Sequence, residues 1–409
     1  MSRYLGAAPG FLVAVDLPPG PAWLEVVEDL WEAETAILPL DPRLTDRERR
    51  TIVDLARPAS VVTIGDEVLF ADPAPPQPGH LGLVVATSGT GGGPKLVELS
   101  RSAITAALEL SFTALAPFAG GAALERSERW VCCLSPAHIG GMLVLMRHVV
   151  TGAPVTVLDR LGLDPLGSID PLEAMPDVPV GAHVALVPTM LRRLVAAGTD
   201  LSRFGILLVG GAELDAGLAQ QATAQGGRIV STYGLTETCG GIAYDERLFD
   251  GTRARIAADG GIELLGPTIM LGYRHDPAAT AAAFTLDGWL RTADAGDVLE
   301  DGRLRVDGRA DEAIRTGAET VWPQEVEIAL RDHPKVLDVA VAGRPHPEWG
   351  KQVVAFVVPV AMDDPPGLEE LRAHVEGRIA RFKSPKAVVL MTDLPRTASG
   401  KIRRRELPS

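Results

Sequence analysis

The stretch TSGTGGGPK, from Thr87 to Lys95, combines four glycines and one proline with three hydroxyl side chains and ends on a lysine. Glycine lets a backbone approach an anion closely, and hydroxyl and N–H groups donate to it, so this composition is typical of a phosphate-binding loop. The apolar run Leu81–Ala86 predicts a buried strand that ends in the loop. The spacing differs from a Walker loop, because Leu96 rather than a hydroxyl residue follows Lys95. A glycine-rich surface turn is the alternative.

The length and composition favour a folded protein of at least two domains. The chain has 409 residues, of which 46% are hydrophobic and 22% are charged, and it exceeds what one core usually supports. Its formal net charge of −14 argues against nucleic acids or anionic membranes as general partners. The sequence has no unbroken apolar run of the roughly 18 to 20 residues that span a membrane, so we expect no membrane insertion.

The cysteines and the N-terminus bear on the compartment. Cys132, Cys133 and Cys239 lack the spacing of a metal site, and we expect them to be reduced and structural. The apolar stretch near the N-terminus is too short and too interrupted for a secretory signal. Together these features predict a cytoplasmic protein.

Around the glycine-rich stretch, helix and strand patterns alternate, which predicts an α/β fold with a parallel or mixed sheet. The predicted helices are Pro21–Glu34, Thr45–Ala56, Arg101–Pro117, Met142–Val150 and a segment carrying Arg192 and Arg193. The predicted strands are Ala36–Leu40, Val61–Ile64, Leu81–Ala86, Arg129–Leu134, Pro154–Leu158, His183–Val187 and Ile206–Val209. Thr45 and Ser100 stand where helix N-caps are expected. Several strands finish in small or polar loops, and such loops can converge on one crevice.

One more strand, beginning near Gly227, leads into the sequence STYGLTET, which contains Tyr233, Thr236 and Glu237. A tyrosine can stack on a base, a threonine can donate to a phosphate, and a glutamate can hold Mg²⁺ against phosphate oxygens. A turn with a half-buried tyrosine is the alternative.

The texture changes after Arg253, where short β-like segments and glycine turns predominate. We therefore expect a large N-terminal α/β domain, residues 1–309, with a β-rich end. Asp294 and Arg309 lie in loop contexts there and suit ribose hydroxyls and phosphates. Residues 310–409 predict a separate small α+β domain, with helices at Pro323–Arg331 and Leu368–Ile379. That domain ends in a basic segment that presents Lys401 on a Ser-Gly turn.

The motifs TSGTGGGPK, STYGLTET, GWLRTAD, GRADEAIRTGAE and LPRTASGK occur in this order, and the series resembles that of the adenylate-forming superfamily. The resemblance spans about Ala36 to Leu407. It implies an AMP-forming acid–thiol ligase, in which a carboxylate attacks the α-phosphate of ATP to give an acyl-adenylate and a thiol, usually that of CoA, then displaces AMP. ATP, Mg²⁺, CoA and a small carboxylic acid are the implied ligands. Alignment and charge neutralisation would supply most of the catalysis.

The same resemblance assigns roles by motif position. The implied roles are a mobile phosphate grip (Thr87, Ser88, Gly89, Thr90 and Lys95), an adenine site (Gly210, Gly211, Ala212, Tyr233 and Gly234), an α-phosphate contact (Thr236), a Mg²⁺ ligand (Glu237), ribose contacts (Asp294 and Arg309), a hinge (Asp311) and a catalytic lysine (Lys401). The superfamily rotates its small domain between half-reactions, so the turn Thr316–Glu319 would then replace Lys401 near the thioester-forming site. The domain boundary would lie near residue 310.

The choice of acid rests on Ser135–Arg147, which resembles the acyl-pocket region of short o-succinylbenzoate-CoA ligases of menaquinone biosynthesis. That acid is a dicarboxylate, so its free carboxylate needs a cation or several donors in the pocket. His138 and Arg147 are the candidates. The alternative makes His138 a packed loop histidine and Arg147 a surface charge of its helix.

Other functions stay open at the level of sequence. An acyl- or aryl-CoA ligase for another acid would want an apolar pocket without a buried cation. A stand-alone adenylation enzyme would load a carrier protein instead of CoA, and a nucleotide-binding pseudoenzyme would catalyse nothing. The presence of Lys401, Glu237, Asp294 and Arg309 argues against the pseudoenzyme. A homodimer is a further possibility.

Overall fold

The computed structural model describes residues 4–18, 20–76, 80–88, 93–119, 125–158, 178–317, 319–396 and 402–408. These residues divide into two compact units. The first comprises residues 1–254, 264–290 and 300–304, and the second comprises residues 255–263, 291–299 and 305–409. The second unit thus begins within the β-rich region that the sequence assigned to the end of the large domain. The domain boundary and hinge that the sequence predicts near residue 310 stay a prediction.

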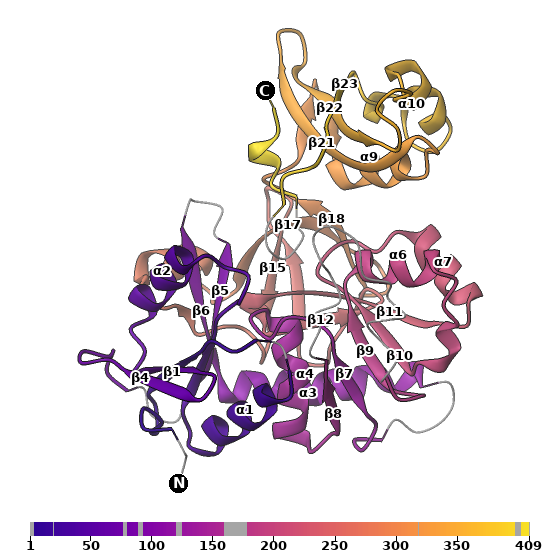
Figure 1. Cartoon of the computed structure of the whole chain (residues 1–409). Helices are drawn as coiled ribbons and strands as arrows, with labels where there is room; N and C mark the ends of the chain where they lie inside the picture. Colours follow the sequence, from indigo (N-terminus) through magenta and orange to yellow (C-terminus); the bar gives the residue numbers. More distant parts are fainter. Residues whose placement is uncertain are drawn as a thin grey trace. The chain divides into compact units, whose positions relative to one another are not determined.

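The first unit contains two large sheets, each of seven strands within the described residues (Figure 1). The first sheet has the order β16-β6-β5-β2-β1-β3-β4. Its strands are β1 (Leu12–Val15), β2 (Ala36–Pro39), β3 (Ser60–Thr63), β4 (Asp66–Leu69), β5 (Leu81–Ser88), β6 (Pro94–Ser100) and β16 (Gly272–Tyr273). Strands β2, β1 and β3 pair in parallel, as does β5 with β2, whereas β6 runs antiparallel to β5. The sheet is therefore mixed.

The second sheet has the order β13-β12-β11-β10-β9-β7-β8. Its strands are β7 (Trp130–Cys132), β8 (Val155–Val157), β9 (His183–Leu186), β10 (Ile206–Val209), β11 (Arg228–Leu235), β12 (Gly240–Tyr244) and β13 (Arg247–Leu248). The strands from β8 to β11 are all parallel, and β12 and β13 continue the sheet in antiparallel fashion. The loops after β7, β9, β10 and β11 consequently leave the sheet at one edge.

Helices cover both faces of these sheets. Apolar side chains that point alternately to the two faces of a strand explain why. The helices of this unit are α1 (Ala22–Glu32), α2 (Asp46–Ala56), α3 (Arg101–Leu115), α4 (Ile139–Thr151), α6 (Pro188–Ala196), α7 (Ala216–Ala224) and α8 (Pro277–Ala283). On β7, Trp130 and Cys132 join the core formed with α1, α3 and α4, whereas Val131 and the residue after the strand, Cys133, join the core under α6 and α7. Because successive side chains of a strand point to opposite faces, one apolar run serves two cores.

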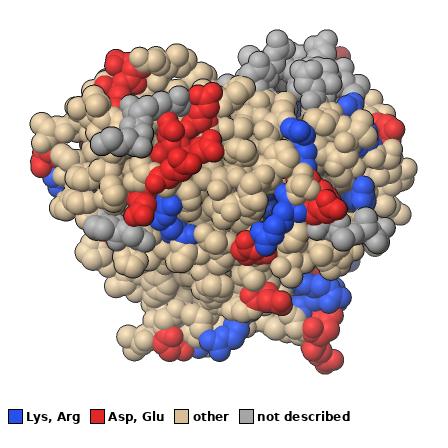
Figure 2. All heavy atoms as spheres, turned by 90° about the horizontal axis from the view of Figure 1, so that it is seen from below, with Lys and Arg blue, Asp and Glu red and all other residues tan. Residues whose placement is uncertain are grey.

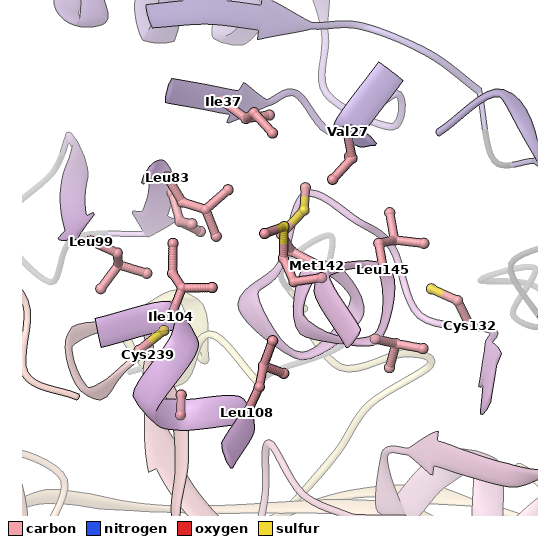
Figure 3. Packing of buried hydrophobic residues seen from close by; sticks show 14 of the residues in the cluster. Val27, Ile37, Leu83, Leu99, Ile104, Leu108, Cys132, Met142, Leu145 and Cys239 are labelled. Carbon is pink, nitrogen blue, oxygen red and sulfur yellow. The ribbon is translucent and has the colours of Figure 1, made fainter. Parts of the chain in front are cut away.

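Helix α4 lies at the centre of the largest core. In Figure 3, Met142 and Leu145 of α4 lie between Val27 of α1 and Leu108 of α3, and all four are buried. Burying a side chain of this size is worth about 1.5–3 kcal/mol. This packing fixes α4, which carries His138 at its start and Arg147 near its end.

Two predicted helix starts are confirmed by their capping bonds. The Thr45 side chain accepts a hydrogen bond from the Glu48 N–H, and the Glu48 carboxylate accepts one from the Thr45 N–H, which forms a capping box before α2. Ser100 Oγ accepts from the Ala103 N–H at 3.0 Å at the start of α3. Each such cap is worth about 1 kcal/mol.

The second unit holds most of a four-stranded sheet and a small α+β body. The four strands are β14 (Arg253–Ile256), β15 (Gly261–Leu265), β17 (Leu290–Val298) and β18 (Leu304–Arg309). The α+β body contains β19 (Ile314–Thr316), β20 (Glu319–Val321), α9 (Pro323–Arg331), β21 (Val336–His346), β22 (Gly350–Pro359), α10 (Leu368–Val375) and β23 (Ala387–Leu390). Helices α9 and α10 pack on one face of its sheet, and Leu394 and Leu407 near the C-terminus pack on the other.

The surface carries no large basic area on the face shown in Figure 2, where Lys and Arg lie among Asp and Glu. Among the described residues, no helix has both the length and the apolar character that a membrane span requires.

Some observed helices and strands differ from those predicted from the sequence pattern. Strands β1, β4 and β6 were not predicted. The segment after the glycine-rich stretch is a strand, β6, rather than a direct lead into α3, so the stretch closes an antiparallel hairpin. Helix α10 ends at Val375, four residues before its predicted end at Ile379. The predicted turn at Thr316–Glu319 is a tight hairpin in which these two residues pair.

Candidate functional site

The glycine-rich stretch joins β5 to β6, and the pairing of these strands brings its two ends together. Thr87 is the cross-strand partner of Lys95, and Thr87 Oγ1 donates to the Lys95 carbonyl at 3.4 Å. Gly89 and Thr90, and the side chain of Ser88, lie outside the described residues. The hairpin therefore places one hydroxyl and one ammonium group of the predicted phosphate grip side by side.

Lys95 and Glu237 are linked through Tyr273, a residue to which the sequence assigned no role. The Lys95 Nζ lies over the Tyr273 ring, 4.5 Å from its centroid. The Tyr273 hydroxyl donates to Glu237 Oε1 at 3.0 Å. A predicted phosphate-binding cation and a predicted metal-binding carboxylate thus flank one aromatic side chain.

Thr236 and Glu237 lie in a turn after β11 whose backbone is fixed by hydrogen bonds. Thr238 is fully buried, accepts from the Leu235 N–H at 2.8 Å and donates to the Gly240 carbonyl at 2.7 Å. The Met270 N–H donates to the Glu237 carbonyl at 2.9 Å. These bonds fix the backbone of the turn and leave the side chains of Thr236 and Glu237 half-buried rather than in the core.

Two glycines allow close approaches around β11: Gly210 brings the loop after β10 close to β11, and Gly234 brings the end of β11 close to β12. A Cβ on Gly210 would lie 2.4 Å from Thr232 Cγ2, and one on Gly234 would lie 1.9 Å from the Gly240 carbonyl oxygen. Neither position has room for a side chain. Since Val209 of β10 pairs with Ser231 of β11, the segment Gly210–Ala212 follows directly beside the half-buried Tyr233. The residues predicted to bind adenine thus lie next to one another, and their role stays a prediction.

The residues fit a Mg²⁺ ion that is shared with phosphates. Among the described residues, no group of three or more His, Cys, Asp or Glu side chains gathers into a metal cage. Mg²⁺ in nucleotide sites commonly takes only one or two protein carboxylates, with phosphates and waters as its other ligands. Glu237, with one oxygen bonded to Tyr273, suits that arrangement.

The second unit brings Asp294 and Arg309 together. Arg309 Nη1 lies 3.9 Å from Asp294 Oδ1, and Arg309 Nε donates to Asp311 Oδ1 at 3.1 Å. Burial opposes the charge of the guanidinium, but the hydrogen bond and charge of Asp311 outweigh it and raise the pKa of Arg309. The predicted hinge residue therefore holds the predicted ribose-binding arginine.

Lys401 lies outside the described residues, but the residues after it are anchored. Arg404 forms 2.6 Å ion pairs with Glu312 and with Glu327 and donates to the Val341 carbonyl at 3.1 Å. Glu327 is almost fully buried and also accepts from the Val341 N–H. The segment that follows Lys401 is thus tied to α9, to β21 and to the residue after Asp311.

His138 begins α4 at the carboxyl end of β7 and belongs to a polar cluster with Asp41 and Arg43. Arg43 donates to both oxygens of Asp41, at 2.9 and 2.7 Å, and its Nη2 lies 3.2 Å from His138 Nε2. Burial opposes ionisation of Asp41, but bonds from His138 and Arg43 outweigh it and hold the pKa of this carboxyl well below its usual value. The charge of Arg43 is consequently neutralised.

Arg147 does not meet His138. The two residues are nine positions apart on α4, or about 13 Å along its axis. Arg147 is 7% exposed and lies near the amino ends of β7 and β9, with its guanidinium 4.0 Å from the Trp130 ring centroid. It is a buried group, so the interpretation as a surface charge is wrong. The structure therefore does not bring the two predicted acyl-pocket residues together.

The partners of Arg147 are neutral. Its Nη2 donates to Ser111 Oγ at 2.6 Å, and it also hydrogen-bonds Tyr244, whose hydroxyl lies 2.6 Å from the same Ser111 oxygen. Among the described residues, no carboxylate forms an ion pair with it. A cavity of about 10 Å³, room for about one water molecule, adjoins its guanidinium.

Sequence reasoning missed Tyr273, Asp41 and Arg43. Tyr273 belongs to a two-residue strand, which is too short for any periodicity to show. Asp41 and Arg43 follow β2, so the rule that places ligand loops at strand ends could have selected them.

Comparisons with known proteins identify the family of the chain. Residues 65–260 match the family model of the AMP-binding enzymes, and residues 325–401 match that of the AMP-binding enzyme C-terminal domain. A probable 2-succinylbenzoate–CoA ligase of Mycobacterium tuberculosis is 36% identical over 331 residues, which cover 80% of this chain and 83% of that protein. The chain belongs to the AMP-binding enzyme family. Within this family, the 2-succinylbenzoate–CoA ligase of Bacillus licheniformis is 32% identical, over 79% of this chain and 69% of that protein.

Solved structures of the family share the fold. The o-succinylbenzoate CoA synthetase of Bacillus subtilis, solved with its acyl-adenylate intermediate, matches with a TM-score of 0.84 and 24% identity over 98% of this chain and 89% of that one. ATP-bound MatB from Rhodopseudomonas palustris matches with a TM-score of 0.80 and 23% identity over 98% and 88%. The predicted α/β fold and the predicted enzyme class, an AMP-forming acid–thiol ligase, are confirmed for this chain.

Proposed function

We propose that this enzyme activates o-succinylbenzoate with ATP and transfers the acyl group to CoA, as the names of its relatives suggest for them. The observation that carries the proposal is the linked set of Lys95, Tyr273 and Glu237, which joins a phosphate-binding hairpin to a metal-binding turn. Such a set serves a reaction in which two anions must approach each other. ATP, Mg²⁺ and CoA are the proposed ligands, and the cytoplasm is the proposed compartment.

Each residue has a proposed task in the first half-reaction. Thr87 and Lys95 bind the β- and γ-phosphates, Tyr233 stacks on adenine beside Gly210–Ala212, and Thr236 contacts the α-phosphate. Asp294 and Arg309 bind the ribose, and Lys401 bridges the carboxylate and the α-phosphate. Mg²⁺ held by Glu237 would neutralise phosphate oxygens. The acid's carboxylate oxygen attacks the α-phosphorus, and the bond to pyrophosphate breaks.

The dicarboxylate character of the acid is supported by Arg147. A buried guanidinium with only neutral partners leaves a positive charge that an anion nearby would neutralise. Arg43 is less suited to this task, because Asp41 already neutralises it. We therefore retain Arg147 as the residue that selects for a second carboxylate and place His138 at the opposite end of the acid.

The experiment measures pyrophosphate release from ATP and Mg²⁺ across a panel of acids, with and without CoA. The panel contains o-succinylbenzoate, benzoate, and short and medium fatty acids. We expect release with o-succinylbenzoate and a CoA thioester as product. Preference for another acid would retain the enzyme class and refute the substrate. Release without thioester formation would indicate a carrier protein as acceptor, and no release with any acid would contradict the function.

The role of Lys401 makes a separate prediction. Lys401→Ala should abolish adenylation, because the bridge between two anions is lost, and should leave thioester formation from supplied acyl-adenylate largely intact. Pyrophosphate release and thioester formation are measured separately on the same preparation. Equal loss of both half-reactions would contradict the assignment.

The homodimer stays a prediction. Analytical ultracentrifugation of the same protein tests it by measuring the mass of the particle in solution.

A further inference from the structure

Tyr273 stands between two groups of the proposed nucleotide site and has no role in the assignments above. It lies on β16, whose two residues pair with β6 so that Tyr273 is opposite Val97 and Gly272 is opposite Glu98. Lys95 belongs to the same strand β6, two residues before Val97. The pairing therefore sets the tyrosine beside the strand that carries the phosphate-binding lysine.

The backbone of Tyr273 is fixed from both sides. Its N–H donates to Thr280 Oγ1 at 2.8 Å, and the next N–H, that of Arg274, donates to the Leu96 carbonyl at 2.8 Å. The buried Arg274 side chain also forms a 2.8 Å ion pair with Glu98 and donates to the Ala56 carbonyl. A side chain on so restrained a backbone can hold its neighbours at fixed distances.

The phenol acts as a hydrogen-bond donor to Glu237. The Tyr273 hydroxyl donates to Glu237 Oε1 at 3.0 Å, because an ionised carboxylate can only accept. Among the described residues, no other hydrogen bond to the Glu237 carboxylate is found, so its second oxygen can accept another ligand. The ring face attracts the Lys95 ammonium.

We propose that Tyr273 is a positioning residue, which orients Glu237 for Mg²⁺ through its hydroxyl and holds Lys95 for the phosphates through its ring. This inference rests on the proposed function, since it deepens the roles of Glu237 and Lys95 there. The two contacts use different parts of one side chain. Their effects on Mg²⁺ and on ATP are consequently separable by substitution.

Two substitutions separate the hydroxyl from the ring, and a third is the control. Tyr273→Phe removes only the bond to Glu237, and Tyr273→Leu removes that bond and the ring under Lys95. Tyr244→Phe is the control, because Tyr244 is likewise a tyrosine with a bonded hydroxyl but contacts Ser111 and Arg147 instead. Urea unfolding of each variant checks that it is folded.

The readout is ATP binding by calorimetry at a series of Mg²⁺ concentrations, without acid or CoA, so that no turnover is needed. Tyr273→Phe should raise the Mg²⁺ concentration for half-maximal binding roughly two- to tenfold, the loss expected for one hydrogen bond. ATP binding without Mg²⁺ should be unchanged in this variant. Tyr273→Leu should in addition weaken Mg²⁺-free ATP binding by about two- to fivefold, as loss of a partly exposed cation–π contact predicts.

Several outcomes would overturn the proposal. An unchanged or lower Mg²⁺ requirement in Tyr273→Phe would show that the hydroxyl does not prepare Glu237. An equal shift in Tyr244→Phe would mean a general effect on the fold. A wild-type protein that binds MgATP but releases no pyrophosphate with any acid would contradict the proposed function alone, whereas absence of MgATP binding would contradict both.

Discussion

Arg404, which is half-buried, and Arg147, which is buried, have opposite surroundings. Arg404 in the second unit is held by two carboxylates, Glu312 and Glu327, each at 2.6 Å. Arg147 in the first unit has a hydroxyl at 2.6 Å and an aromatic ring as partners, and no carboxylate among the described residues pairs with it. Desolvation acts on both guanidinium groups, yet neighbouring charges raise the pKa of Arg404, whereas burial lowers that of Arg147.

The difference separates a structural charge from a charge available for a ligand. A buried ion pair with good geometry is expensive to break, because removal of one partner leaves the other charged and desolvated. A buried cation with neutral partners leaves no such charge behind when it is replaced. We therefore expect Arg404 to matter for stability and Arg147 to matter for the choice of acid.

The largest expected effect is that of Arg404→Ala. It leaves the buried Glu327 with only the longer 3.8 Å contact to Arg331, so the free energy of unfolding of the second unit should fall by about 3 kcal/mol, the lower end of the loss expected for a broken buried ion pair. Urea unfolding followed by tryptophan fluorescence measures this loss. The matched control is Arg403→Ala. Among the described residues, Arg403 forms an ion pair with Glu406 alone, in an exposed i,i+3 contact, so its loss should cost at most about 1 kcal/mol. Equal effects in the two variants would contradict the structural role of Arg404.

Arg404→Ala should also lower adenylation more than thioester formation, because Arg404 follows Lys401 by three residues and anchors its segment. The rates of the two half-reactions are compared without urea, at a temperature at which the variant is folded. A uniform loss of both would make Arg404 a stabilising residue without influence on Lys401.

The sequence selected Arg147 as a candidate for the acid site, but it did not predict the contrast with Arg404. Motif order predicted a catalytic role for Lys401, and the basic run after it was visible, yet nothing distinguished Arg404 among three successive arginines. Its partners Glu312 and Glu327 lie 92 and 77 residues away, and only tertiary packing brings them together. Arg147 was selected from a motif stretch, whereas its burial depends on Trp130 and Ser111, which come from another strand and helix.

The difference between local and long-range contacts also explains why most of the fold was predictable and the role of Tyr273 was not. Helices α2 and α3 follow from local caps and apolar spacing, and the parallel strands follow from buried apolar runs. Strand β6 was hidden because the glycine-rich stretch suggested a loop into a helix. Tyr273 needs that unpredicted strand as its partner, so its contact with Lys95 could not be inferred from residues 271–274 alone.

The second expected effect is on specificity. Arg147→Met should raise KM for o-succinylbenzoate by about tenfold, the loss of one charge-assisted interaction, and should change KM for a monocarboxylic acid far less. Its free energy of unfolding should change by no more than about 1 kcal/mol, because Ser111 and Tyr244 remain bonded to each other. Steady-state kinetics with both acids, together with urea unfolding, test this. A stability loss as large as that of Arg404→Ala would erase the distinction.

The smallest expected effect is on the pKa of His183, which depends on the charge of Arg147. Its Nδ1 accepts from the Ile206 N–H at 2.7 Å, so its Nε2–H donates to Glu128 and the ring is neutral. Burial lowers the pKa of His183, Glu128 opposes this, and the positive charge of Arg147 lowers it further.

Because the folded-state pKa of His183 lies below its unfolded value of about 6.5, the unfolded chain binds the proton first as the pH falls. The stability that the neutral ring contributes is therefore present above pH 6.5 and is lost as the pH decreases toward the folded-state pKa. Arg147→Met removes one cause of the lowering, so NMR titration should find a higher pKa for His183 and urea unfolding should lose less stability at acid pH. An unchanged pKa would mean that the charge of Arg147 is already neutralised, and the contrast with Arg404 would then fail.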